Sequence, residues 1–210
     1  MPAPEQILDG LHQIANEWQS LAILWHLYFG ALVVALALGQ RPSKRISGIL
    51  LAVPLLSVSI LAWLAANPFN GSVFAVVGVA LLIMAMRLPD EPIQLAPTWV
   101  LIAGALMVLF GWVYPHFLDT TSYLPYLYAA PTGLIPCPTL SIVIGLCLMV
   151  DGLASRSWSW VLGATGLFYS LFGALRLGVT IDLVLLIGAL LLIAISFGGK
   201  VAMQKSALAH

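Results

Sequence analysis

Charged side chains are scarce in this sequence. They form 8% of its 210 residues, whereas hydrophobic residues form 61%. A soluble domain usually carries about 25% charged residues. Basic and acidic residues number eight each, so the formal net charge is zero and no basic surface for nucleic acid is expected. We therefore predict an integral membrane protein whose main partner is the lipid bilayer and which has no nucleic-acid partner.

Other absences narrow the function. No lysine lies inside a predicted span, which excludes a retinal Schiff base. Neither a GxxxxGK[ST] phosphate loop nor a GxSxG nucleophile elbow is present. Met1 to Ser20 contains no lysine or arginine, so we expect no cleavable signal peptide. The two cysteines, Cys137 and Cys147, lie ten residues apart on one predicted helix. That is roughly 15 Å of helical rise, too far for a disulfide.

The apolar residues come in long runs without the alternation of strands, which predicts an all-α bundle in the membrane. We expect about seven transmembrane helices, preceded by an interfacial amphipathic helix. The predicted spans are 19–39, 46–66, 71–87, 98–114, 131–150, 158–178 and 180–197. The domain organisation is then an N-terminal helix over residues 1–18, a transmembrane domain over 19–197 and a cytoplasmic tail over 198–210.

Residues 4–18 are typical of a helix that lies in the membrane interface. Its polar face carries Glu5, Asp9 and Glu17. Its apolar face is formed by Ile7, Leu8, Leu11, Ile14, Ala15 and Trp18. Small residues also recur at a seven-residue spacing in three spans, as in Gly104 and Gly111, and we interpret them as packing seams.

The basic residues predict the orientation. With seven spans, Arg176 falls alone on one side and the other seven of the eight basic residues fall opposite. Basic loops are retained in the cytoplasm. We therefore expect a multi-pass protein of the bacterial inner membrane, with the N-terminus periplasmic and the C-terminus cytoplasmic.

The stretch Ala130 to Thr139 holds three prolines and a glycine at the start of the fifth predicted span. Proline removes a backbone donor and clashes with the preceding turn, so this start cannot be a regular helix. Irregular backbone at membrane depth must be covered by protein or line a cavity. Two interpretations remain open. The helix start aims its free N–H groups into a cavity and binds a ligand, or Thr132 or Thr139 caps a buried helix start.

Polar side chains gather near this motif in the predicted topology. The candidate ligand-binding residues are His26, Asn67, His116, Thr132, Pro136, Cys137 and Thr139. His26 and Cys137 lie at a similar predicted depth, and a thiol with an imidazole suits a soft metal such as copper or zinc. The alternative for His26 is a hydrogen bond to a neighbouring helix. Arg176 and Asp182 are expected to form an interfacial ion pair.

The chain resembles a family of uncharacterised bacterial multi-pass membrane proteins. The resemblance rests on Asn67-Pro68, Tyr114-Pro115, Ala130-Pro131-Thr132, Pro136-Cys137-Pro138-Thr139, and Gly178 with Asp182. It covers about residues 60–195. Members commonly have Phe-Gly after the Ala-Pro-Thr, where this chain has Gly133-Leu134, and a second threonine where it has Leu140. The resemblance implies the fold and marks the motif, and it supplies no activity or cofactor.

Together these features predict a membrane protein that binds or passes a small solute or ion at a pocket beside the broken helix start. An accessory subunit of a larger membrane complex, with membrane partner subunits, is one alternative. A metal-dependent or redox membrane enzyme is the other.

Overall fold

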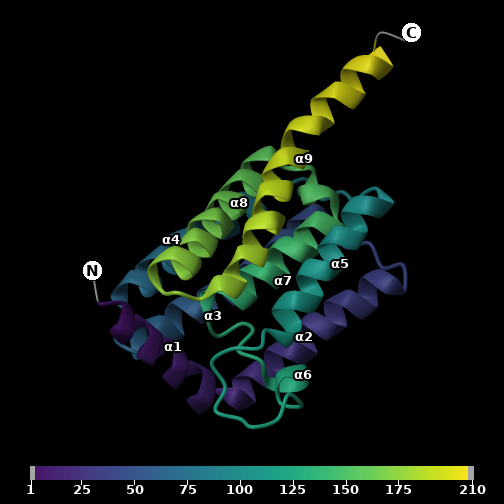
Figure 1. The fold of residues 1–210 in the computed structure, drawn as a ribbon. Helices are drawn as coiled ribbons and strands as arrows, with labels where there is room; N and C mark the ends of the chain where they lie inside the picture. The colour runs from purple at the N-terminus through teal and green to yellow at the C-terminus, as the bar shows by residue number, and fades with distance from the viewer. Residues whose placement is uncertain (1–2, 208–210) are drawn as a thin grey trace.

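The computed structural model describes the backbone of residues 3–207 and the side chains of residues 3–197. In this part the chain is all-α, as predicted (Figure 1). The α-helices are α1 Pro4–Glu17, α2 Gln19–Ala37, α3 Lys44–Leu64, α4 Pro68–Met86, α5 Thr98–Val113, α6 Tyr126–Ala129, α7 Pro136–Met149, α8 Arg156–Leu171 and α9 Leu183–Ala207. Three short helical turns join the later helices: η1 Asp151–Ala154, η2 Phe172–Arg176 and η3 Thr180–Asp182. Helix α9 continues into the segment predicted as a tail, of which residues 208–210 lie outside the described part.

Five helical segments within the described residues are long and apolar enough to cross a membrane. They are α2, α3, α4, α8 with η2, and residues 180–197 of η3 and α9. Helices α5 and α7 are also apolar but have only 16 and 14 residues. At 1.5 Å per residue they span about 24 and 21 Å, less than the ~30 Å of a hydrocarbon core.

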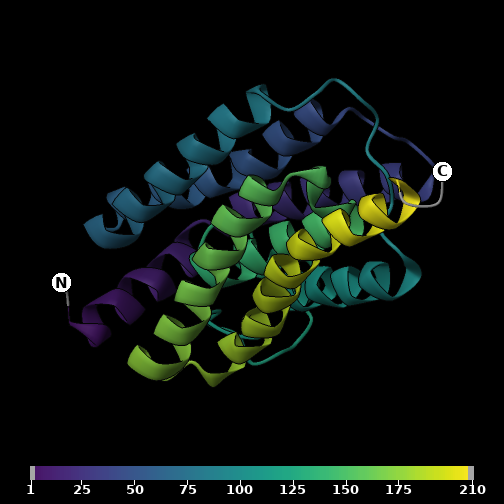
Figure 2. The ribbon, with the colours of Figure 1, turned by 90° about the horizontal axis from the view of Figure 1, so that it is seen from above.

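Helix α7 forms the centre of the bundle, between the α3–α4 and α8–α9 hairpins (Figure 2). Twelve of its 14 residues are buried. Its main partner is α5, and two glycines allow the close approach. A Cβ on Gly104 would lie 2.6 Å from the carbonyl oxygen of Gly145, and one on Gly111 would lie 2.5 Å from that of Pro138. The packing seam predicted from the glycine spacing is therefore confirmed for α5, which runs antiparallel to α7.

The connections gather at two ends of the bundle. At the end that we call the basic end, Ile93 N–H donates to the carbonyl of Pro42, and Ala96 N–H donates to that of Met149. These bonds join the α2–α3 loop, the α4–α5 linker and the end of α7. At the opposite end, which we call the α1 end, lie α1, the α5–α6 segment, the start of α7 and the turn between α8 and α9 (Figure 1).

Helix α1 has the predicted amphipathic pattern, but the bundle covers its apolar face. Ile7, Leu11 and Ile14 are buried. They belong to one apolar cluster with Leu61 of α3 and Ile135 at the start of α7. Because this face is filled by protein, α1 acts as a cover on the α1 end of the bundle.

Candidate functional site

The proline motif is held by two threonine hydroxyls. Thr139 Oγ1 accepts from Gly133 N–H at 2.8 Å and donates to the carbonyl of Ile135 at 2.6 Å. Thr132 Oγ1 donates to the carbonyl of Gly111 on α5 at 2.6 Å. The residue that precedes α7 is Ile135, which offers no side-chain cap. The prediction that Thr132 or Thr139 caps the helix start is therefore wrong, because both hydroxyls tie the loop to its surroundings.

Gly133 shows why the loop needs a glycine. Its φ is +77°, a conformation that side chains with a Cβ rarely adopt. The ring of Trp25 on α2 also occupies the space where a Cβ would lie. The loop therefore packs tightly against α2 and leads directly into Pro136, the first residue of α7.

The first turn of α7 places Cys137 beside the buried carboxylate of Asp182. Cys137 Sγ donates to Asp182 Oδ2 at 3.1 Å, and the hydroxyl of Tyr114 donates to Oδ1 at 2.6 Å. Tyr114 has no exposed surface, and Asp182 is 2% exposed. Arg176 is exposed. The ion pair predicted between Arg176 and Asp182 is therefore wrong, since the carboxylate turns inward to neutral donors.

Five elements besides α7 build this arrangement. Tyr114 follows the last residue of α5, and Asp182 ends η3. Gly173, in the π-helical turn η2, leaves the space that the carboxylate fills, because a Cβ there would overlap Asp182 Oδ2. On the far side, the hydroxyl of Tyr169 on α8 donates to Asn70 Oδ1 on α4 at 3.1 Å. Thus α4, α5, α7, α8 and η3 all contribute a polar group.

A small cavity adjoins the carboxylate. Asn70, Tyr114, Cys137, Tyr169 and Asp182 all line it. Its volume of ≈ 20 Å³ is sufficient for about one water molecule. The oxygen atoms around this space are the ligands that hard cations prefer. The cavity can therefore hold one water molecule, a hydronium ion or one small cation. It is too small for an organic solute.

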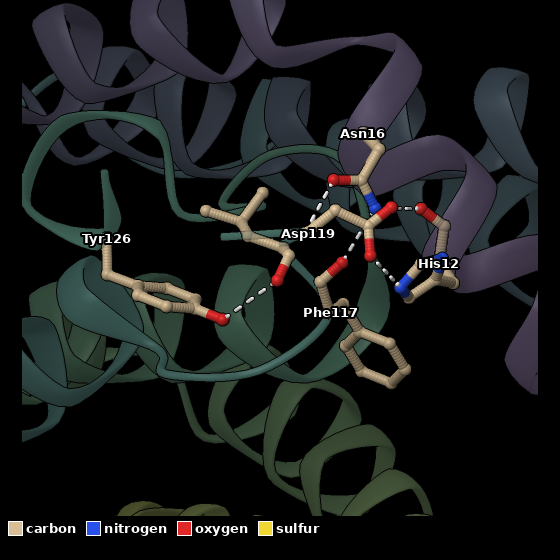
Figure 3. A network of polar contacts seen from close by, with 6 residues as sticks. His12, Asn16, Phe117, Asp119 and Tyr126 are labelled. Atoms are coloured by element: carbon tan, nitrogen blue, oxygen red, sulfur yellow. Dashed lines mark hydrogen bonds and ion pairs between the residues drawn. The ribbon is translucent and has the colours of Figure 1, made fainter. Parts of the chain in front are cut away.

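Two apolar side chains at the α1 end, Leu11 of α1 and Phe117 of the α5–α6 segment, also line this cavity. The backbone of Phe117 has a φ of +75°, which is strained for an aromatic residue. Asn16 of α1 holds this segment: its Nδ2 donates to the carbonyl of Phe117 at 2.9 Å, and its Oδ1 accepts from Asp119 N–H at 2.8 Å. His12 Nε2 lies 3.1 Å from Asp119 Oδ1 (Figure 3). We call these contacts of Asn16 and His12 the clasp.

Next to the clasp, His116 lines an open cleft with His12 and Asp9. Its ring packs against Phe117, with ring centroids 4.2 Å apart. Burial, with the nearby His12, lowers the pKa of the His116 imidazole. His116 is therefore on the outer side of the cover and takes no part in the Asp182 cavity.

The structure separates His26 from Cys137. His26 Nδ1 lies 2.8 Å from the carbonyl oxygen of Ala22, and Nε2 lies 3.0 Å from that of Trp112. His26 lines a cleft with Trp112, whereas Cys137 lines the cavity at Asp182. Within the described residues no group of three or more His, Cys, Asp or Glu side chains could hold a metal ion. Nε2 faces a carbonyl oxygen of α5, so the structure shows the contact between helices that was the alternative for His26.

Of the other predicted residues, Pro136 lines the cavity beside Cys137. Asn67 is buried at the start of α4, where its Oδ1 accepts from Asn70 N–H at 3.1 Å. The sequence reasoning missed Tyr114, Tyr169, Asn70 and the central role of Asp182. One signal was available for the last of these, because Asp182 is the only acidic residue inside a predicted span and such residues mark functional sites.

Comparison of the chain with family models, curated proteins and solved structures found no match. The resemblance to uncharacterised bacterial membrane proteins stays a prediction.

Proposed function

We propose that this chain crosses the membrane seven times and presents the α1 end to the periplasm and the basic end to the cytoplasm. Arg41, Lys44 and Arg45 lie in or beside the α2–α3 loop, which the α4–α5 linker contacts at the basic end. Retention of basic loops in the cytoplasm supports this orientation. Helices α5 and α7 are short for a bilayer, and their mutual packing inside the bundle supports their role as the two further crossings.

The function that this site supports best is reversible binding of a proton or a small cation at Asp182. A single observation carries the proposal: a buried carboxylate borders a water-sized cavity and has only neutral partners. Among the side chains of residues 3–197, the ion pairs are His12–Asp119 and Lys44–Glu91, so Asp182 has no basic partner there. An unpaired charge is costly to bury, so the group is neutralised by a proton or a cation.

The arrangement suits exchange of the bound ion. Tyr114 and Cys137 each donate to one carboxylate oxygen, which stabilises the charged form when the ion leaves. The cavity that Asp182 lines provides space for a water or a cation beside the carboxylate. Leu11 of α1 and Phe117 of the α5–α6 segment lie between this space and the periplasmic side. Exchange therefore requires movement of α1 or of the α5–α6 segment.

Infrared difference spectroscopy of the purified protein in lipid tests the proposal directly. The carboxylic C=O stretch of Asp182 should appear and disappear on titration with acid, or change on addition of Na⁺ or K⁺ at fixed pH. Asp182→Asn should abolish that signal. Asp90→Asn, at an exposed acid of the α4–α5 linker, is the matched control and should leave it. A carboxyl signal that survives Asp182→Asn unchanged would refute the proposal.

A further inference from the structure

A second cavity lies far from Asp182, as a groove between α2, α3 and α7 at the basic end. It has a volume of ≈ 50 Å³. Its walls are almost wholly apolar and include Leu32, Leu36, Leu50, Leu51 and Leu146. Ile93 of the α4–α5 linker contributes to its lining at the basic end. A groove of this size and lining fits part of one hydrocarbon chain.

One polar atom in the groove has no partner. Ser47 is 7% exposed and lines the groove, and its Oγ makes no hydrogen bond within the described part of the chain. A serine inside a helix usually donates to the carbonyl four residues before it. Here the carbonyl of Ser43 accepts only from the backbone N–H of Ser47. A buried hydroxyl without a partner costs about 1–3 kcal/mol, so the groove presents an unsatisfied donor to any occupant.

Arg41 lies next to one wall residue of the groove. The Arg41 guanidinium donates through Nη1 to the carbonyls of Leu36 and Gln40, at 3.1 and 2.8 Å. Leu36 is itself a wall residue, so the charge of Arg41 stands at the rim, with further N–H groups free to donate. Lys44 Nζ pairs with Glu91 at 2.8 Å, and Arg45 Nε donates to the carbonyl of Leu88. Arg41 is thus the cation that bonds a wall residue of the groove, and it has no acidic partner among the described ion pairs.

We propose that this groove binds one anionic phospholipid of the cytoplasmic leaflet. From the membrane surface inward, the groove presents a cation, then a hydroxyl, then apolar side chains. This is the order of the phosphate, the glycerol esters and the acyl chains of a phospholipid. Arg41, in the loop, meets the phosphate; Ser47, in the second turn of α3, donates to a glycerol ester carbonyl; the leucines deeper in the groove meet one acyl chain. No acidic side chain lines the groove. A cationic amphiphile would therefore lack a partner, whereas an anionic headgroup has one.

Native mass spectrometry of the detergent-purified protein tests this inference. The protein is titrated with dioleoyl phosphatidylglycerol and with dioleoyl phosphatidylcholine. Phosphatidylglycerol should bind about fivefold more tightly, as expected for one basic residue near an anionic headgroup. Arg41→Gln should reduce its affinity to that of phosphatidylcholine. Arg87→Gln removes an exposed charge at the end of α4 and should leave the preference unchanged.

The groove itself is tested by filling it. Ala35 lines the groove, and Ala35→Phe should abolish retention of both lipids. Ala37→Phe adds the same ring two residues further along α2, at an exposed position, and should have no effect. Ser47→Ala should weaken both lipids about fivefold, the value of roughly one hydrogen bond.

Equal binding of the two lipids would overturn the inference, and so would equal retention by Ala35→Phe and Ala37→Phe. Circular dichroism identifies a variant that fails to fold. If Ala35→Phe is such a variant, Ser47→Ala decides, since undiminished retention by that variant contradicts the proposed site.

Discussion

Tyr114→Phe should destabilise the protein by more than the loss of an ordinary tyrosine hydrogen bond. The change removes one hydroxyl and keeps the ring, which has no exposed surface. The lost bond, 2.6 Å long, is donated to the buried Asp182 carboxylate. A hydrogen bond to a charged group contributes about 1.5–3 kcal/mol, against 0.5–1.5 kcal/mol for a neutral one. We expect a loss of about 2 kcal/mol in the free energy of unfolding at a pH where Asp182 has released its proton, and the smaller loss of a neutral bond where it is protonated.

Tyr28→Phe is the matched control. The hydroxyl of Tyr28 donates to the backbone carbonyl of Leu50 at 2.8 Å, and its ring is half-buried. Its removal should cost about 1 kcal/mol. The assay is reversible unfolding in mixed micelles of dodecyl sulfate and a mild detergent, followed by circular dichroism.

A double-mutant cycle then separates the bond from the ring. If the hydroxyl acts through the charge of Asp182, Tyr114→Phe should cost only about 0.5–1.5 kcal/mol in an Asp182→Asn background, where the amide oxygen still accepts a neutral hydrogen bond. The coupling should then be about 1 kcal/mol. Additive effects of the two substitutions, or a cost no larger than that of Tyr28→Phe, would refute a charged hydrogen bond at this site.

Three further predictions concern backbone space and pH. Gly173→Ala should force the Asp182 carboxylate to move and destabilise the protein by about 1–3 kcal/mol. Gly10→Ala is the control, because a Cβ there makes only an ordinary 3.6 Å contact. Equal effects of the two substitutions in the same unfolding assay would contradict the close fit at Gly173. Ala154 is exposed and has a φ of +51°, a backbone conformation that is strained for alanine. Ala154→Gly should therefore stabilise the protein by about 1 kcal/mol. Destabilisation by this substitution would show that the backbone strain at Ala154 is absent. The pKa of His116 is lowered in the folded protein, so the unfolded chain binds more protons just below the ordinary histidine pKa. The free energy of unfolding should therefore fall as pH drops below about 6.5, and its dependence on pH should be weaker in His116→Gln. An unchanged dependence on pH in that variant would contradict the prediction.

The sequence predicted the features that depend on local chemistry or on spacing along one helix. Gly104 and Gly111 share a face, and that face meets α7. The prolines of the Ala130–Thr139 stretch predicted an interrupted helix start, and the structure has a loop there until Pro136. The regular helix nevertheless includes Pro136 to Thr139, which the prediction had placed in irregular backbone. Asn67, predicted as a ligand-binding candidate, is the capping residue of α4 in the structure.

The convergence of side chains could not be predicted in the same way. Depth along a helix follows from the residue count, but which helices are neighbours depends on the packing of the whole bundle. His26 and Cys137 were predicted at similar depth, and both α2 and α7 contact α5, yet His26 lines a cleft with Trp112 whereas Cys137 lines the cavity at Asp182. Asp182 and Tyr114 are 68 residues apart in the sequence. They make a hydrogen bond because η3 and the last turn of α5 lie side by side at the α1 end of the bundle.

The burial of α7 has a consequence for the biogenesis of the protein. A newly made segment is retained in the bilayer by its exposure to lipid tails, yet 12 of the 14 residues of α7 end up enclosed by protein. Its helical length is about 21 Å, and its first turn carries two prolines that lack an N–H. Such a segment is a weak signal for insertion on its own. Helices α8 and α9, which enclose it, emerge from the ribosome after it. In the seven-crossing topology proposed above, α7 therefore relies on its packing against α5 to stay in the membrane until α8 and α9 have been made.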